Sequence, residues 1–155
     1  MRALAVLALA LLPGLQLEAQ TTFAVYGGAG WGFNETDGSA AVRGALEVNR
    51  PGRLGARIGV THAAGRAFVA AEARVDLETG LSVFVPYLVG GVGTALGDGD
   101  AHLLLTAGGG LRSRLNPRID LFVEARLFAV PDDDERERMV PLTAGVRIRL
   151  GSAAR

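Results

Sequence analysis

The chain has 155 residues, of which 16 are basic and 16 acidic, and it contains no cysteine. One domain is the default expectation at this length, and 22 glycines with 49% apolar and only 6% aromatic residues exclude a coiled coil, a disulfide scaffold and a charged disordered tail. The balanced charge argues against a nucleic-acid partner, because a domain that neutralises phosphates normally carries a basic excess.

The first residues are typical of a secretory signal peptide. Arg2 supplies a positive charge, residues 3–12 form an unbroken Ala/Leu/Val run, and Pro13-Gly14 ends that run. The run is too short for a spanning helix, which needs roughly 20 apolar residues. We therefore expect a signal peptide over residues 1–19 and a mature domain over residues 20–155.

Period-two alternation follows this segment and predicts strands rather than helices. The alternation is clear over residues 42–49, 54–61, 69–77, 119–127 and 142–150, and weaker in the glycine-rich runs 22–33, 85–96 and 102–115. Segments rich in Gly, Pro, Asn and Asp separate these runs and predict turns. Eight strands joined in chain order are the expected arrangement.

Eight antiparallel strands favour closure into a barrel. Strands of about 10 residues tilted by about 45° span the ~25 Å apolar band of an outer-membrane barrel. Closure also pairs the first strand with the last, so that no sheet edge is left to recruit other chains. We predict an all-β fold, an eight-stranded antiparallel up-and-down transmembrane β-barrel.

Whether the apolar face of the strands points into the barrel or out of it distinguishes two classes of barrel. A soluble secreted barrel would bury the apolar face around a small apolar ligand, whereas a membrane barrel would turn that face to lipid. The apolar face consists of Val, Leu, Ile and Ala, which suit a lipid contact and would fill a soluble lumen poorly without large aromatic residues. Candidates for an aromatic girdle near the strand ends are Trp31, Phe33, Phe84, Tyr87 and Phe128. Parity, however, places Tyr87 and Phe128 on the polar face. The soluble barrel and a narrow solute conduit remain the alternatives.

Four segments of the second half carry a family resemblance. They are PYLVGGVG at 86–93, GGGLR at 108–112, NPRIDLFVEAR at 116–126 and PLTAGVRIRL at 141–150. Together they resemble the small eight-stranded outer-membrane β-barrels of Gram-negative bacteria, of the OmpA-barrel and OmpX kind. The resemblance covers essentially all of the mature chain. It implies an outer-membrane location, a monomer, contact with membrane lipid and lipopolysaccharide, and insertion by the barrel assembly machinery. That machinery commonly reads a terminal aromatic residue in this family, whereas here the last strand closes on Leu150.

The resemblance places the polar faces of the strands inside the barrel. The expected lumen network consists of Arg43, Glu47, Arg57, Glu72, Arg74, Asp76, Glu124, Arg126, Arg147 and Arg149. The interior of an eight-stranded barrel is about wide enough to be filled by side chains, so these charges must pair with one another. The basic residues are all arginines, whose planar fork can bridge several oxygens at once. We expect a salt-bridged plug and a structural or envelope-stabilising role.

Catalysis, cofactors and metals have little support in the sequence. His62 and His102 stand in no nucleophile or metal-ligand spacing, and no His-x-Ser pair is present. The glycine runs 27–30 and 90–93 lack the Lys-Ser/Thr of a nucleotide loop. The acidic run 132–135 does not match a calcium loop. We therefore expect no enzyme activity, no cofactor and no metal.

Overall fold

The computed structural model describes residues 22–34, 38–49, 53–77, 83–97, 100–131 and 136–150, so the expected signal peptide lies outside the described residues. The strands are β1 (Thr22–Phe33), β2 (Gly38–Asn49), β3 (Leu54–Ala63), β4 (Arg66–Asp76), β5 (Phe84–Gly97), β6 (Asp100–Arg114), β7 (Ile119–Pro131) and β8 (Arg136–Arg149). The described part of the chain includes no helix long and apolar enough to cross a membrane.

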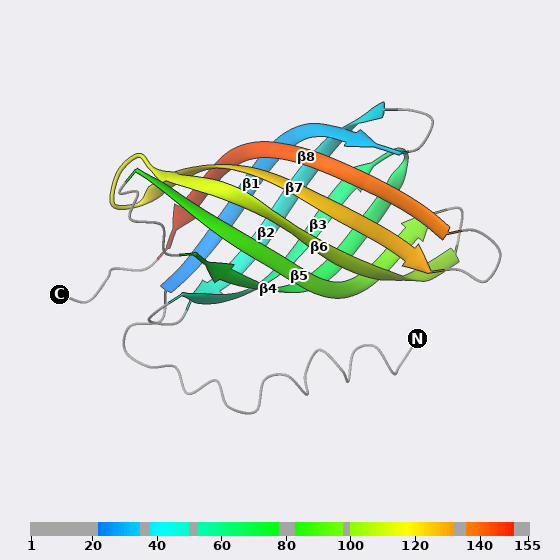
Figure 1. Ribbon diagram of the computed structural model, residues 1–155, viewed down its shortest axis with the longest axis horizontal. Coiled ribbons are helices and arrows are strands. Elements are labelled where there is room, and N and C mark those ends of the chain that lie inside the picture. The colour runs from blue at the N-terminus through cyan, green and yellow to red at the C-terminus, as the bar shows by residue number, and fades with distance from the viewer. Residues whose placement is uncertain are drawn as a thin grey trace, which may run out of the picture.

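The sheet closes on itself. Each strand pairs antiparallel with the next one in the chain, and β1 also pairs with β8 (Figure 1). The predicted eight-stranded up-and-down barrel is confirmed. The ladders extend further than the alternation predicted, since β2 begins at Gly38 and β8 at Arg136 rather than at residues 42 and 142. Backbone groups continue to pair wherever a neighbouring strand runs alongside, whatever the polarity of the side chains.

The two ends of the barrel differ in their connections. The start of β1, the end of β8 and the connections after β2, β4 and β6 share one end, which we call the terminal end (left in Figure 1). The connections after β1, β3, β5 and β7 share the other, the distal end. At the terminal end, the Leu150 N–H donates to the Phe23 carbonyl at 2.7 Å. At the distal end, Ala64 (φ 51°) and Gly65 (φ 74°) turn the chain sharply between β3 and β4, as in a two-residue hairpin with two positive φ angles.

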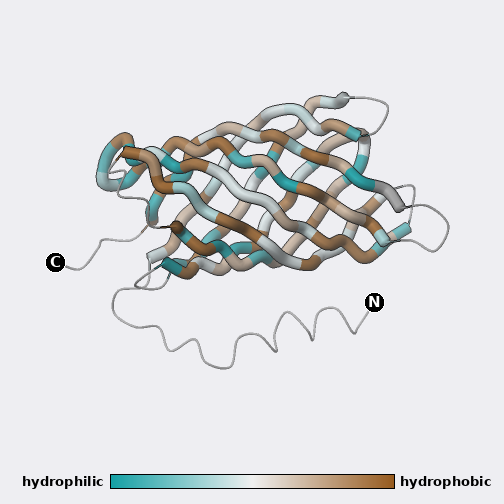
Figure 2. Tube along the Cα trace, in the orientation of Figure 1, coloured by the Kyte–Doolittle hydropathy of each residue, from teal (hydrophilic) through white to brown (hydrophobic). Residues whose placement is uncertain are grey.

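The apolar side chains point outward and the charged ones inward. In β3, exposed and buried residues alternate at every position, and Figure 2 shows brown and paler or teal segments alternating along the strands. Leu121 and Ile148 are 45% exposed and Val146 is 37% exposed, whereas Glu124 is 1% and Arg147 is 2% exposed. This is the orientation expected of a membrane barrel, and it is opposite to the one that a soluble ligand carrier requires.

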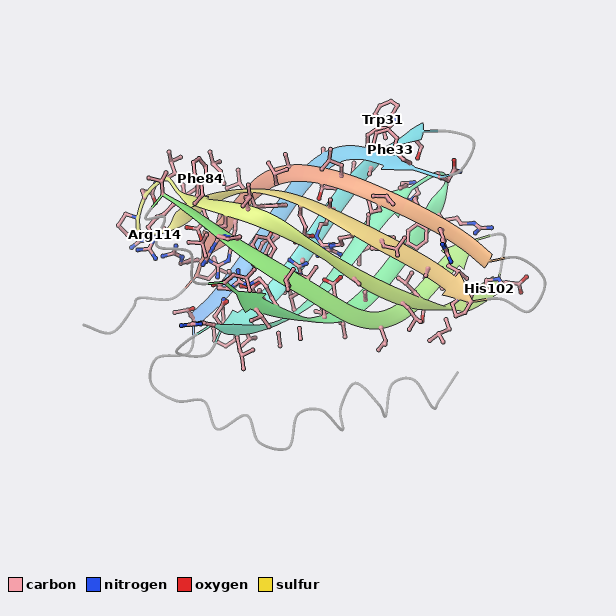
Figure 3. All side chains as sticks on the ribbon, viewed as in Figure 1. Trp31, Phe33, Phe84, His102 and Arg114 are labelled. Atoms are coloured by element: carbon pink, nitrogen blue, oxygen red, sulfur yellow. The ribbon has the colours of Figure 1, made fainter. Side chains whose placement is uncertain are left out.

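Exposed aromatic side chains lie near both ends of the outer surface. Trp31 and Phe33 are about half exposed at the distal end, and Phe84 is half exposed at the terminal end (Figure 3). The girdle prediction was wrong for Tyr87 and Phe128, which are both 2% exposed. The reason is parity, since both occupy inward positions, where Arg74 lies over the Tyr87 ring at 5.7 Å and Arg126 over the Phe128 ring at 5.9 Å.

Candidate functional site

Charged side chains from β2, β3, β4, β7 and β8 meet inside the barrel, from its middle toward the terminal end. Eight of the ten residues predicted for the lumen are at most 4% exposed, namely Arg43, Glu47, Arg57, Glu72, Arg74, Glu124, Arg126 and Arg147. The side chains of Asp76 and Arg149 are each 16% exposed near the terminal mouth. The register of the strands brings some opposite charges together directly. Glu47 lies opposite Arg57, and Arg57 lies opposite Glu72, on successive strands.

Glu72 is the hub of a central cluster. One carboxylate oxygen accepts hydrogen bonds from Arg57 Nε at 2.7 Å and Arg43 Nη2 at 3.2 Å. The other oxygen accepts from Arg126 Nη1 at 2.7 Å and Thr106 Oγ1 at 2.9 Å. Donors from four other strands thus converge on one carboxylate, which ties opposite walls of the barrel together.

Glu124 completes this central cluster. It pairs with Arg126 on its own strand and lies 2.8 Å from Arg57 Nη1 and 3.9 Å from Arg43 Nε. Three arginines therefore share two carboxylates, and each arginine contacts both of them. Shared contacts of this kind offset the desolvation that would make an isolated buried ion costly.

A second cluster occupies the space toward the terminal mouth. Arg147 bridges Asp120 at 2.7 Å and Glu47 at 3.0 Å. Arg149 also pairs with Asp120, and Arg112 lies 2.7 Å from Asp76 and 3.6 Å from Asp120. Arg74 donates to Asn49 Oδ1 at 2.8 Å and lies 3.4 Å from both Glu47 and Asp76.

Tyr26 stands between the two clusters. Its hydroxyl donates to Glu47 Oε2 at 2.6 Å and accepts from Arg74 Nη1 at 3.1 Å. The guanidinium groups of Arg57 and Arg147 lie 5.8 and 5.6 Å from its ring centre, within the range of cation–π attraction. The ring itself meets Phe122 edge-on, with centroids 5.4 Å apart.

The distal half of the lumen is apolar, which the sequence did not predict. A cluster of buried side chains lies there, and its members are Ala41, Ala63, Phe68, Ala70, Ala95, Leu104, Phe128, Val130 and Met139. The rings of Phe68 and Phe128 pack with centroids 5.0 Å apart. Within the described residues, the interior therefore holds two layers, one ionic and one aromatic and aliphatic.

Several network members were missed at the sequence level. Asp120 is fully buried and binds three arginines, yet its inward position could have been inferred from its parity with Glu124. Arg112 and Thr106 lie on the glycine-rich β6, where the alternation is weak. Tyr26 lies on a similar strand, β1, and its role could be seen only after the register placed it beside β2 and β8.

An inward glycine makes room for one of the large lumen side chains. A Cβ on Gly110 would lie 2.6 Å from the Tyr87 hydroxyl oxygen and 2.7 Å from Cζ. The Cβ would also meet the Val123 carbonyl oxygen on the paired strand. We expect Gly110→Ala to lower the free energy of unfolding by about 1–3 kcal/mol, because both the Val123 backbone and the buried Tyr87 side chain must move. Urea unfolding of the refolded barrel in detergent micelles would measure the change.

Gly44 offers the matched control. It faces outward, and a Cβ there would meet nothing nearer than the Tyr26 carbonyl oxygen at 3.9 Å. We expect Gly44→Ala to leave stability unchanged or to raise it by up to about 1 kcal/mol through the unfolded chain. Equal losses in the two variants would show that glycine is needed for strand flexibility rather than for space.

The histidines and one of the serines occupy positions without catalytic geometry. His62 is exposed on β3 and His102 is half-buried on β6, and these strands do not pair. Ser39 Oγ accepts a hydrogen bond from the Ala64 N–H at 2.9 Å. No group of three or more His, Asp or Glu side chains in the described ranges could hold a metal ion.

Solved structures share this barrel architecture. Neisserial surface protein A is 16% identical with a TM-score of 0.63, and the match covers 84% of this chain and 97% of that one. The N-terminal barrel domain of Pseudomonas aeruginosa OprF is 14% identical with a TM-score of 0.56, over 83% and 98% of the two chains. A de novo designed transmembrane β-barrel is 21% identical with a TM-score of 0.61, over 83% and 95%.

These comparisons establish the fold. No protein-family model and no curated protein matches the sequence. The chain has the closed, up-and-down architecture of the small eight-stranded outer-membrane β-barrels, as its sequence resemblance implied.

Proposed function

We propose that the protein is an integral outer-membrane β-barrel with a structural, envelope-stabilising role and a lumen closed by its own side chains. The observation that carries this proposal is the inverted distribution of side chains. Large aliphatic residues cover the outside of the barrel, whereas the arginines and carboxylates at inward positions pair inside. Hydrocarbon stabilises the first arrangement, and water would stabilise the reverse.

The size of the apolar belt fits a bilayer. On β1, Phe23 and Phe33 are both about half exposed and face outward near the two ends of the strand. Ten residues at about 3.3 Å each and a tilt of roughly 40–45° separate them by roughly 25 Å along the barrel axis. This separation matches the apolar band of an outer-membrane barrel, with aromatic side chains at its borders.

The paired charges and the apolar side chains of the interior support a structural role over a conduit. The central cluster joins five strands through Glu72, and the Phe68–Phe128 layer lies beyond it toward the distal end. A solute would have to displace both layers. The soluble ligand carrier is disfavoured because the middle of the interior is ionic rather than apolar.

The proposed partners follow from the same location. Membrane lipid contacts the outer face, lipopolysaccharide surrounds it in the outer leaflet, and the barrel assembly machinery inserts the chain as a monomer. We propose no catalytic role, because the described histidines lie on strands that do not pair.

Fractionation tests the location directly. The native protein should remain with outer membranes through salt and carbonate washes and be released only by detergent. It should also migrate faster on gels before boiling than after, as a folded barrel does. A product that is freely soluble in the periplasm would contradict the proposal.

Conductance tests the closed lumen. Folded protein inserted into a planar bilayer should give no large, stable conductance if the paired charges and the apolar layer close the lumen, as we propose. The inserted fraction should be checked by its migration before and after boiling. Stable openings of porin-like size from a preparation that is folded by this criterion would refute the plug.

A further inference from the structure

The terminal end of the barrel carries a group of arginines around one tight turn. Arg114 ends β6, Arg118 lies in the turn that precedes β7, and both are exposed. Arg149, at the end of β8, donates through Nη1 to the Pro117 carbonyl at 3.1 Å, and its backbone N–H donates to the Arg118 carbonyl at 2.8 Å. Three arginines thus lie within one short stretch of the rim, and the guanidinium group of Arg149 is held by the turn itself. Figure 3 shows Arg114 at this end, close to Phe84.

Hydrogen bonds within the turn hold its backbone close to the barrel wall. The Leu115 N–H donates to the Ile119 carbonyl at 3.0 Å. Asn116 Oδ1 accepts from the backbone N–H groups of Arg118 and Ile119, each at 2.8 Å. A turn closed by its own hydrogen bonds cannot extend its arginines far from the end of the apolar belt.

Exposed leucines lie beside the arginines of this turn, and one of them, Leu115, is part of the turn itself. Its side chain is 65% exposed, the highest value among the exposed large apolar residues of the described chain. Leu111 on β6 is also exposed, at 51%. Two leucines next to arginines form a surface with one part suited to acyl chains and one suited to phosphate, as at a membrane–water interface.

The carboxylates near this turn are already engaged. Asp120 lies opposite Arg114 in the ladder, but its oxygens bind Arg147, Arg149 and Arg112 inside the mouth. Asp76 is paired with Arg74 and Arg112. Among the described residues of the mouth, four arginines (Arg74, Arg112, Arg147 and Arg149) share three carboxylates (Glu47, Asp76 and Asp120). Arg114 and Arg118 add to this excess of positive charge. A fixed positive excess at the border of the apolar belt is complementary to an anionic headgroup.

We propose that the turn formed by Arg114, Leu115 and Arg118, which Arg149 holds in place through the Pro117 carbonyl, binds the phosphate headgroup of an anionic phospholipid in the leaflet at the terminal end. The guanidinium groups take the phosphate oxygens, a geometry for which arginine is suited. Leu115 and Leu111 contact the acyl chains. The inference rests on the proposed membrane location, and it adds a lipid class and a leaflet.

Native mass spectrometry can test this site on the full folded chain. The protein is released from mixed micelles with equal amounts of phosphatidylglycerol and phosphatidylcholine, and the retained lipids are counted. Wild type should retain phosphatidylglycerol preferentially. In the double variant Arg114→Gln/Arg118→Gln, the ratio of retained phosphatidylglycerol to phosphatidylcholine should fall about fivefold for each arginine removed.

The matched control removes the same charge at the distal end. Arg66→Gln/Arg138→Gln should keep the preference, because those residues lie on β4 and β8 away from the turn. An equal loss in the control would mean that only net charge matters, and an unchanged preference in the Arg114/Arg118 variant would also refute the site. Inorganic phosphate at millimolar concentration should not displace the lipid, and displacement would identify a free-anion site instead.

Failure of this inference can be separated from failure of the proposed function. Migration before and after boiling reports whether each variant is a folded barrel, and flotation with vesicles reports whether it is inserted. A wild-type protein that is inserted but has no lipid preference overturns the headgroup site alone. A wild-type protein that does not float with vesicles overturns the membrane location.

Discussion

Glu72→Gln is expected to lower the free energy of unfolding by about 3–5 kcal/mol, the cost of removing one partner from a buried ion pair. Glu72 accepts hydrogen bonds from Arg43, Arg57 and Arg126 and is 4% exposed. The amide cannot neutralise these arginines, so Glu124 would remain as the only carboxylate of the central cluster. Urea titration of the refolded barrel, followed through its single tryptophan, Trp31, gives the change.

Two further variants distinguish ion pairing from loss of a carboxylate in general. Asp76→Asn removes a charge whose side chain is 16% exposed at the mouth. Water can reach Arg112 there, and Arg74 keeps Glu47 and Asn49 as partners, so the cost should be below about 1 kcal/mol. Glu72→Gln/Arg43→Gln restores the charge balance of the central cluster and should be less destabilised than the sum of its two single variants. Additive losses, or an unchanged stability in Glu72→Gln, would contradict a role for Glu72 as the hub.

The fold could be predicted because it depends on a property that is local in sequence. A strand points successive side chains to opposite faces, and a stretch such as Leu142 to Leu150 reveals its two faces without any knowledge of its neighbours. The barrel then follows from the number of strands and the cost of open edges. The same local rule places eight charged residues at inward positions where they are at most 4% exposed, although the predicted network omitted the buried Asp120.

The rest of the site depends on register and on neighbours. Parity places Phe68 and Leu104 inward just as it does Glu72, but it does not reveal that the apolar members gather in the distal half of the lumen. It also does not reveal that Tyr26 meets Glu47, which lies 21 residues away in the sequence. Glycine-rich β1 and β6 weaken the pattern itself, and for this reason Arg112 was not recognised.

Whether lipid or water surrounds the barrel can be tested with two arginine substitutions at different depths on the outer face of β3. Ile58 lies in the middle of β3 and Leu54 at its terminal end, and their side chains are 53% and 59% exposed on the same outer face. In phospholipid vesicles, Ile58→Arg should lower the free energy of unfolding by about 2–4 kcal/mol, and Leu54→Arg by about 0–1 kcal/mol. The difference arises because a guanidinium near the middle of the belt is surrounded by hydrocarbon, whereas one at its border reaches headgroups and water. A barrel bathed in water would tolerate both substitutions, since the two sites are almost equally exposed and neither side chain is packed in the lumen. Equal urea midpoints for the two variants would therefore refute the membrane orientation, and a larger loss at Ile58 would also locate the middle of the bilayer along β3.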